Sequence, residues 1–149
     1  MDTMLIFSLF AEKTFTTALA HKLQIPIGTA EMRSFPDEEI YLRILSDVAN
    51  KNIILICNLD QPNSKILPLM FMAQTMKELG AKKIWLVAPY LPYMRQDQRF
   101  QSGEAVAAKL FAQLISSFID GLVTIDPHLH RIHDLDDIYS IPTDRKSVV

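Results

Sequence analysis

Four polar residues, Arg95, Gln96, Asp97 and Arg99, form the part of this sequence that is best suited to chemistry. They follow the apolar run 84–87 and precede an amphipathic segment, so they lie on a long connection between a strand and a helix. Such loops often carry binding sites, although a solvated surface loop is the alternative interpretation. Because the net charge of the whole chain is only -2, a phosphate ligand would have to be held by local charges such as these.

Three histidines, His128, His130 and His133, follow a second apolar run at 122–125. Imidazoles are good ligands for zinc and other transition metals, which makes a metal site one hypothesis. His128 and His130 would point to opposite sides of a strand, however, and no cysteine is near them. Histidines exposed on a surface are the simpler interpretation.

A turn with three carboxylates, Asp37, Glu38 and Glu39, separates two further segments. The segment 27–35 is compatible with a strand that ends at Phe35. The segment 39–45 alternates apolar and polar residues, which is typical of a half-exposed strand. The pattern predicts a hairpin with the acidic turn at its tip.

The elements that must position these groups alternate between apolar strands and amphipathic helices. Short apolar runs predict buried strands at 4–10, 53–57, 84–88 and 122–125. Helical spacing predicts three helices: 13–23 with Phe15, Ala18, Leu19 and Leu23 on one face, a second that ends near Leu79 before Gly80, and a third capped by Ser102 that reaches Phe118.

This alternation predicts an α/β domain with three layers, in which a mainly parallel, doubly wound sheet lies between helices. Ligands bind at the carboxyl edge of such sheets, where the loop of Arg95 and the loop of His128 should both lie. A chain of 149 residues is long enough for one such domain, which we expect to span residues 1–149.

Composition narrows the class of protein. The small net charge argues against a nucleic-acid partner. No apolar run approaches the length of a membrane span, and Asp2 with Glu12 and Lys13 does not fit a signal peptide. The single cysteine, Cys57, lies in an apolar run and predicts a buried thiol in a reducing compartment. The cytoplasm is the expected location.

Three motifs together resemble the ribose-phosphate pyrophosphokinases, also called phosphoribosyl pyrophosphate synthetases. They are Phe-Pro-Asp-Glu-Glu at 35–39, Pro-Tyr at 89–90 followed by Tyr-Met-Arg-Gln-Asp at 93–97, and Thr-Ile-Asp-Pro-His at 124–128. Their order and spacing match that family, and the segment 99–106 is most similar to its archaeal-like branch. The resemblance implies a phosphoribosyltransferase-like N-terminal domain.

The resemblance also implies roles for the residues of the first two motifs. Phe35 would stack on the adenine of ATP, and Asp37 and Glu39 would bond to the base or its surroundings, across a subunit interface. An aromatic face and carboxylate acceptors suit a purine with an exocyclic amine. The alternative is that Phe35 belongs to the core and the acids to a solvated turn.

Arg95 and Gln96 resemble the pair that holds the phosphates of the nucleotide, because a guanidinium is always charged and forks onto oxygen atoms. Arg99 would add a second cation, and Asp97 is expected to orient the arginines. Without the resemblance, ion pairing at the surface would explain all four residues.

For the third motif, the resemblance implies that His128 helps to hold the Mg²⁺ bound with ATP, with Asp126 beside it. Two departures stand out. An arginine common near the position of Gly103 in bacterial and animal relatives is missing, and Glu38 stands where many members have glycine.

Members of the family have two similar domains, and the second supplies the loop that binds ribose 5-phosphate. No such loop occurs here, and the segment 142–149 lies about where the first domain gives way to the second. We therefore expect the first domain of a ribose-phosphate diphosphokinase, with ATP as a partner, no second domain, no activity alone, and assembly into a homo-oligomer built from dimers. The alternatives are a regulatory homologue without catalysis and an unrelated nucleotide-binding α/β module.

Overall fold

The computed structural model describes residues 3–147 and contains a five-stranded sheet at its centre. All neighbouring strands of this sheet are parallel, in the order β1-β4-β5-β6-β7. Their bounds are Met4–Leu9 for β1, Asn52–Cys57 for β4, Lys83–Ala88 for β5, Gly121–Ile125 for β6 and Thr143–Lys146 for β7.

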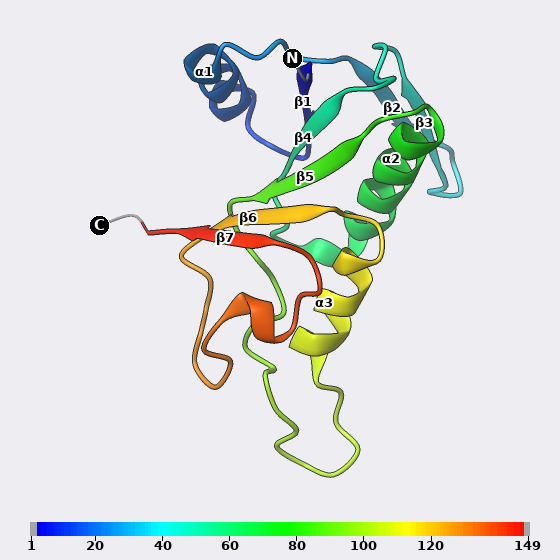
Figure 1. The fold of residues 1–149 in the computed structure, drawn as a ribbon. Coiled ribbons are helices and arrows are strands. Elements are labelled where there is room, and N and C mark those ends of the chain that lie inside the picture. Colours follow the sequence, from blue (N-terminus) through cyan, green and yellow to red (C-terminus); the bar gives the residue numbers. More distant parts are fainter. Residues whose placement is uncertain (1–2, 148–149) are drawn as a thin grey trace.

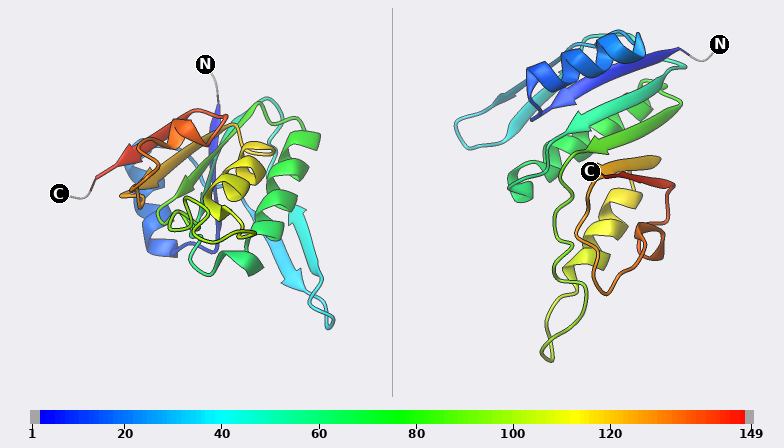
Figure 2. Two further views of the ribbon diagram at one scale, coloured as in Figure 1. Left: turned by 90° about the horizontal axis from the view of Figure 1, so that it is seen from below. Right: turned by 90° about the vertical axis from the view of Figure 1, so that its left-hand side faces the viewer.

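Helices cover both faces of the sheet, as Figures 1 and 2 show. Helix α1 (Lys13–Leu23) lies on one face, and α2 (Ile66–Glu78) and α3 (Ala107–Ser116) lie on the other. Short 3₁₀ turns occur at Pro62–Ser64 and Leu135–Asp137. The three-layer α/β architecture predicted from the sequence is confirmed.

The strands are apolar because each is buried between layers. Leu55 and Leu86 are fully buried on the side of α2 and α3, where most of the core lies. Ile6 and Ile56 are fully buried in a smaller cluster on the side of α1. Each such side chain contributes about 1.5–3 kcal/mol when it leaves water. This packing gives the loops at the strand ends a rigid base.

Strands β2 (Ala30–Ser34) and β3 (Ile40–Ile44) form a separate antiparallel hairpin. The predicted hairpin is therefore confirmed, with its first strand ending one residue before Phe35. The hairpin projects from the main body of the molecule, while Leu42 and Ile44 at its base pack against the main core (Figure 1).

The direction of winding reverses at β1. After α1 the chain returns along the outer edge of β1, where Ile27 forms a parallel bridge with Ile6. It then continues as the hairpin, which packs against α2, and enters β4 on the other side of β1. This reversal makes the fold doubly wound, as predicted.

The bounds of α1 are as predicted, but its predicted buried face is only partly confirmed: Leu19 packs against the smaller core cluster, whereas the other members of that face do not. Thr16 and Ala20 are the buried residues, whereas Phe15 and Leu23 are 38% and 47% exposed. Ala20 packs in the cluster with Ile6 and Ile56. Periodicity weights residues by hydrophobicity, so it overlooks a contact face made of small side chains.

The prediction that Ser102 caps the third helix is also wrong. Helix α3 begins at Ala107, with Val106 at the N-cap position and no side chain bonded to its first turn. The backbone N–H of Ala108 instead donates to the carbonyl of Gln96, at 3.1 Å. A tertiary contact thus satisfies one of the unpaired donors that a serine would have served.

Strand β7 (Thr143–Lys146) did not emerge from the sequence, because a short polar strand at a sheet edge carries no hydrophobic alternation. Within the described range 3–147, no helix is long and apolar enough to cross a lipid bilayer.

Candidate functional site

A cavity of about 350 Å³ opens at the carboxyl edge of the sheet, over β5 and β6. Arg95 and Gln96 line it from the loop after β5, and Asp126 and His128 line it from the loop after β6. The remaining lining residues are Tyr90, Leu91, Tyr93, Met94, Ile125 and Pro127. Four of the predicted site residues, about 30 residues apart in the chain, therefore meet in one cavity because their strands are neighbours.

Each of these two loops contains a residue with an unusual backbone conformation. Tyr93 has a φ angle of 65° and Asp126 a φ angle of 41°, in the left-handed region that side chains other than glycine seldom adopt. Asp126 directly follows β6, and its N–H donates to the carbonyl of Lys146 in β7, at 2.8 Å. Such residues are typical of sites where the surrounding structure holds the chain in one conformation.

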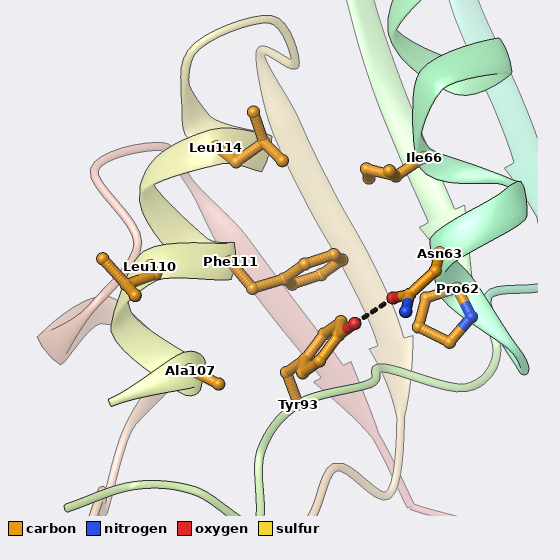
Figure 3. A pocket seen from close by; sticks show the side chains of 8 residues that line it. All are labelled: Pro62, Asn63, Ile66, Tyr93, Ala107, Leu110, Phe111 and Leu114. Carbon is orange, nitrogen blue, oxygen red and sulfur yellow. Dashed lines mark hydrogen bonds between the residues drawn. The ribbon is translucent and has the colours of Figure 1, made fainter. Parts of the chain in front are cut away.

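Tyr93 also anchors the first loop to the 3₁₀ turn Pro62–Ser64 and to α3 (Figure 3). Its hydroxyl group is hydrogen-bonded to Oδ1 of Asn63, and its ring centroid lies 5.2 Å from that of Phe111 in α3. Together with Leu110 and Ile66 these residues line an apolar pocket of about 250 Å³ between α2 and α3. The start of the Arg95 loop is thus fixed to the scaffold.

Arg95 and Gln96 are exposed, as residues that receive a ligand must be. Among residues 3–147, Arg95 has no ion-pair partner, so its guanidinium group is available at the cavity. The carbonyl of Gln96 accepts the N–H of Ala108 in α3. The backbone is therefore tied down while both side chains remain open to solvent.

Asp97 is turned away from the solvent and has a partner that the sequence did not indicate. Its side chain is 1% exposed and accepts the backbone N–H of Arg131 at 3.1 Å and Nη1 of Arg131 at 2.8 Å. Burial raises the pKa of Asp97, but the hydrogen bonds and the charge of Arg131 lower that pKa by more than burial raises it. The net shift of the pKa is therefore downward. Asp97 thus orients Arg131, and neither Arg95 nor Arg99 contacts its carboxylate.

Arg99 does not line the cavity. Its Nε donates to the carbonyl of Glu104, at 2.7 Å, within the same loop. In this structure Arg99 therefore helps to shape the loop, and its predicted role as a second phosphate-binding cation stays a prediction.

The hairpin tip carries the other predicted residues and lies apart from the loops after β5 and β6 (Figures 1 and 2). None of its residues lines the cavity. Phe35 is 42% exposed there. Its ring packs edge-to-face with the ring of Tyr41, and the two ring centroids lie 6.5 Å apart. Oδ1 of Asp37 accepts the N–H of Glu39 at 3.1 Å. Glu38 has a φ angle of 72°, which explains why a glycine is suited to this position.

The donor groups of the cavity fit a magnesium ion that arrives with a nucleotide. Among the described residues no three His, Cys, Asp or Glu side chains gather into a metal cluster, so the three-histidine zinc hypothesis has no support. Mg²⁺ is usually held by one or two carboxylates together with water and substrate phosphates. Asp126 and His128, which both line the cavity, would provide a carboxylate and an imidazole for such an ion.

These features define a class: a doubly wound α/β domain whose carboxyl edge presents a free guanidinium, an amide, a carboxylate and an imidazole around one cavity. That arrangement is typical of α/β domains that bind phosphorylated ligands at this edge. The model of the family "N-terminal domain of ribose phosphate pyrophosphokinase" matches residues 4–118, and the chain belongs to this family.

Individual relatives agree with the family. The chain is 35% identical over 127 residues to the ribose-phosphate pyrophosphokinase of Saccharolobus solfataricus, covering 84% of this chain and 44% of that protein. It is 32% identical over 143 residues to the enzyme of the same name from Mesorhizobium japonicum, covering 95% and 45%. The chain thus spans less than half the length of these relatives.

A solved structure shares the fold. The crystal structure of phosphoribosylpyrophosphate synthetase from Mycobacterium smegmatis superimposes with a TM-score of 0.88, covering 98% of this chain and 49% of that one. The two are 22% identical, so this similarity concerns the fold alone.

Proposed function

We propose that this chain provides the nucleotide-binding half of a ribose-phosphate diphosphokinase. The observation that carries the proposal is the meeting of Arg95, Gln96, Asp126 and His128 around one cavity at the carboxyl edge of β5 and β6. Family membership supports the same assignment. The reaction would transfer the β,γ-diphosphoryl group of Mg-ATP to the C1 hydroxyl of ribose 5-phosphate, giving phosphoribosyl pyrophosphate and AMP.

The residues of the cavity would act by binding and charge stabilisation. The guanidinium of Arg95 would pair with phosphate oxygens, and the amide of Gln96 would donate a further hydrogen bond. Asp126 and His128 would hold Mg²⁺, which neutralises charge on the transferred group. A reaction of this kind would rest on positioning and charge stabilisation rather than on a covalent intermediate.

We propose that the adenine base is met by Phe35, Asp37 and Glu39 of a second copy, in a homo-oligomer built from dimers. Two features support this arrangement: the tip of the hairpin is exposed, and none of its residues lines the cavity of its own chain. A groove of about 830 Å³ beside the hairpin also presents exposed Leu67 and Phe71. Light scattering tests the assembly, and a strict monomer at high micromolar concentration would contradict it.

Titration calorimetry with Mg-ATP tests the nucleotide site. We expect weak binding near millimolar concentration, and a loss of about 10- to 100-fold in affinity for Arg95→Ala, because hydrogen bonds to charged groups contribute about 1.5–3 kcal/mol. Omission of Mg²⁺ should abolish the effect of His128→Ala. No heat from the wild-type chain, with or without Mg²⁺, would contradict the proposal.

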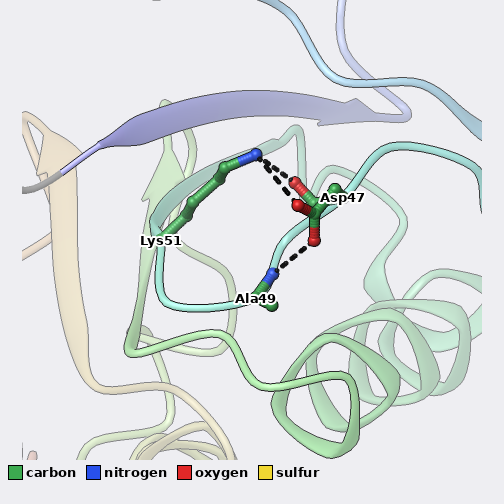
Figure 4. Close-up of polar contacts among 3 residues, drawn as sticks. All are labelled: Asp47, Ala49 and Lys51. Atoms are coloured by element: carbon green, nitrogen blue, oxygen red, sulfur yellow. Dashed lines mark hydrogen bonds and ion pairs between the residues drawn. The ribbon is translucent and has the colours of Figure 1, made fainter.

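A matched control lies at the opposite edge of the sheet (Figure 4). There Nζ of Lys51 lies 3.8 Å from Oδ2 of Asp47 and donates to the carbonyl of Asp47 at 2.6 Å. Lys51→Ala removes a cation and a loop contact without touching the cavity. It should leave the affinity for Mg-ATP unchanged.

Catalysis itself should require more than this chain. The proposed ribose 5-phosphate site has no counterpart among the sequence motifs here, so we expect no phosphoribosyl pyrophosphate from this chain alone. AMP formation that depends on ribose 5-phosphate would overturn this expectation. We also propose a cytoplasmic location, in keeping with a metabolic kinase and with the single free thiol of Cys57.

A further inference from the structure

The two loops that form the cavity are tied together by Asp97 and Arg131. We infer that these two residues are a positioning pair, which holds Arg95 and Gln96 at a fixed distance from Asp126 and His128 and so sets the affinity for a magnesium nucleotide. The inference rests on the proposed nucleotide site and assigns a role to residues that would not touch the ligand.

The geometry of the pair gives it control over both loops. Asp97 directly follows Gln96, and Arg131 lies three residues after His128. Both oxygens of the buried carboxylate are used: Oδ2 accepts the backbone N–H of Arg131 and Oδ1 accepts its Nη1. One bond fixes the main chain of the second loop and the other fixes its side chain, across a separation of 34 residues.

The same guanidinium group makes a second contact, with an aromatic ring. The Cζ atom of Arg131 lies 4.9 Å from the ring centroid of Phe100, which belongs to the same loop as Asp97. An arginine above an aromatic ring gains a cation–π interaction in addition to its ion pair. Arg131 thus contacts two residues of the Arg95 loop, Asp97 and Phe100.

The chemistry of the pair favours a role in geometry over a role in overall stability. The carboxylate of Asp97 is buried, but the side chain of Arg131 is 39% exposed. Ion pairs that reach the solvent contribute little to overall stability, because water screens their attraction. An ion pair with two directed hydrogen bonds instead selects one arrangement of the loops.

A thermodynamic cycle distinguishes positioning from general destabilisation. Arg131→Gln keeps the backbone N–H that donates to Asp97 and removes the positive charge and the guanidinium group. We expect it to weaken binding of Mg-ATP about tenfold, the lower end of what loss of an outer partner costs a metal site. In the His128→Ala background the same substitution should cost less than threefold, because the magnesium contact that it misplaces is already gone.

Two further variants sharpen the test. Arg131→Lys retains the charge and should recover part of the affinity, while the control Lys51→Ala should bind as the wild-type chain does. Wild-type affinity in Arg131→Gln would overturn the inference. An equal loss with and without His128 would also overturn it, because additive losses mean that the pair does not act through the magnesium side of the cavity.

A measurement without a ligand separates this inference from the proposed function. Amide hydrogen exchange, followed by mass spectrometry, should increase in both segments 93–100 and 126–133 of Arg131→Gln, and remain unchanged in β4. If the wild-type chain binds no Mg-ATP, the proposed function fails, and joint loosening of the two segments still supports the pair as a link between the loops. Exchange that is unchanged in either segment would refute the link.

Discussion

Gly121 and Trp85 offer a sharp test of the packing on which the site loops rest. The two residues are register partners on β6 and β5, the strands that lead into the cavity. A Cβ atom added to Gly121 would lie 2.4 Å from Cε3 and 2.5 Å from Cζ3 of the Trp85 ring. Ordinary contacts of a Cβ atom begin at 3.4 Å, so the ring would have to move by about 1 Å.

The expected change in stability is the difference of two terms. Overpacking of this kind costs about 1–3 kcal/mol. Alanine in place of glycine within a strand stabilises the folded state by about 0.5–1 kcal/mol, because the unfolded chain loses conformational freedom. Gly121→Ala should therefore lower the free energy of unfolding by up to roughly 2.5 kcal/mol, and the melting temperature by roughly 3 °C for each kcal/mol.

Urea unfolding measures this change, and Trp85 is the only tryptophan in the chain, so its fluorescence reports on the contact directly. In the Trp85→Leu background, followed by circular dichroism, the sign should reverse: Gly121→Ala should then stabilise by about 0.5–1 kcal/mol. Both residues lie toward the amino ends of their strands, so affinity for Mg-ATP should not change. A loss of stability that persists without the indole ring would refute the reasoning.

Three further outcomes are expected. Phe35→Ala should weaken nucleotide binding by roughly 1–3 kcal/mol if the ring stacks on a base, with an unchanged melting temperature because Phe35 is 42% exposed; equal affinity by calorimetry would exclude stacking. Burial raises the pKa of the Cys57 thiol to about 12. Above about pH 9 the thiol ionises in the unfolded chain but not in the folded one, so the free energy of unfolding should fall as pH rises. Urea unfolding at pH 8 and 10 should show that the wild-type chain loses more stability than Cys57→Ala. The pKa of Asp97 is lowered in the folded state, so its contribution is present at neutral pH and is lost as pH falls below about 4; Asp97→Asn should flatten this part of the acid unfolding curve.

Much of the fold follows from local patterns. The four apolar strands were predicted because parallel strands buried on both faces are continuous apolar runs. The hairpin was predicted because β3 alternates. The end of α2 was predicted from Gly80, which lies two residues beyond the last helical residue and whose φ angle of 96° suits a residue after a helix. The misses, β7 and part of the buried face of α1, concern polar or small residues that hydrophobic patterns do not register.

The site was predictable to the extent that topology alone gathers residues. Arg95, Gln96, Asp126 and His128 each follow a buried strand, and neighbouring parallel strands bring such residues to one edge. Arg131 was missed because its partner lies 34 residues away and no local spacing connects the two. The distance of Phe35 from the loops after β5 and β6 could not be read from local patterns, since it depends on how far the hairpin projects from the body; only the family resemblance implied that Phe35 acts across a subunit interface.

The position of the cavity also refines the rule that ligands bind where the winding of a sheet reverses. The reversal lies at β1, so the rule favours the loops after β1 and β4, whereas the predicted phosphate and magnesium residues meet over β5 and β6. Charge explains the difference. In the loop after β4, Lys65 is already paired with Asp60 and lies 5.8 Å from the ring centroid of Phe10. Over β5, Arg95 has no ion-pair partner within residues 3–147, so we expect an anion to gain more from the edge of β5 and β6 than from the point of reversal.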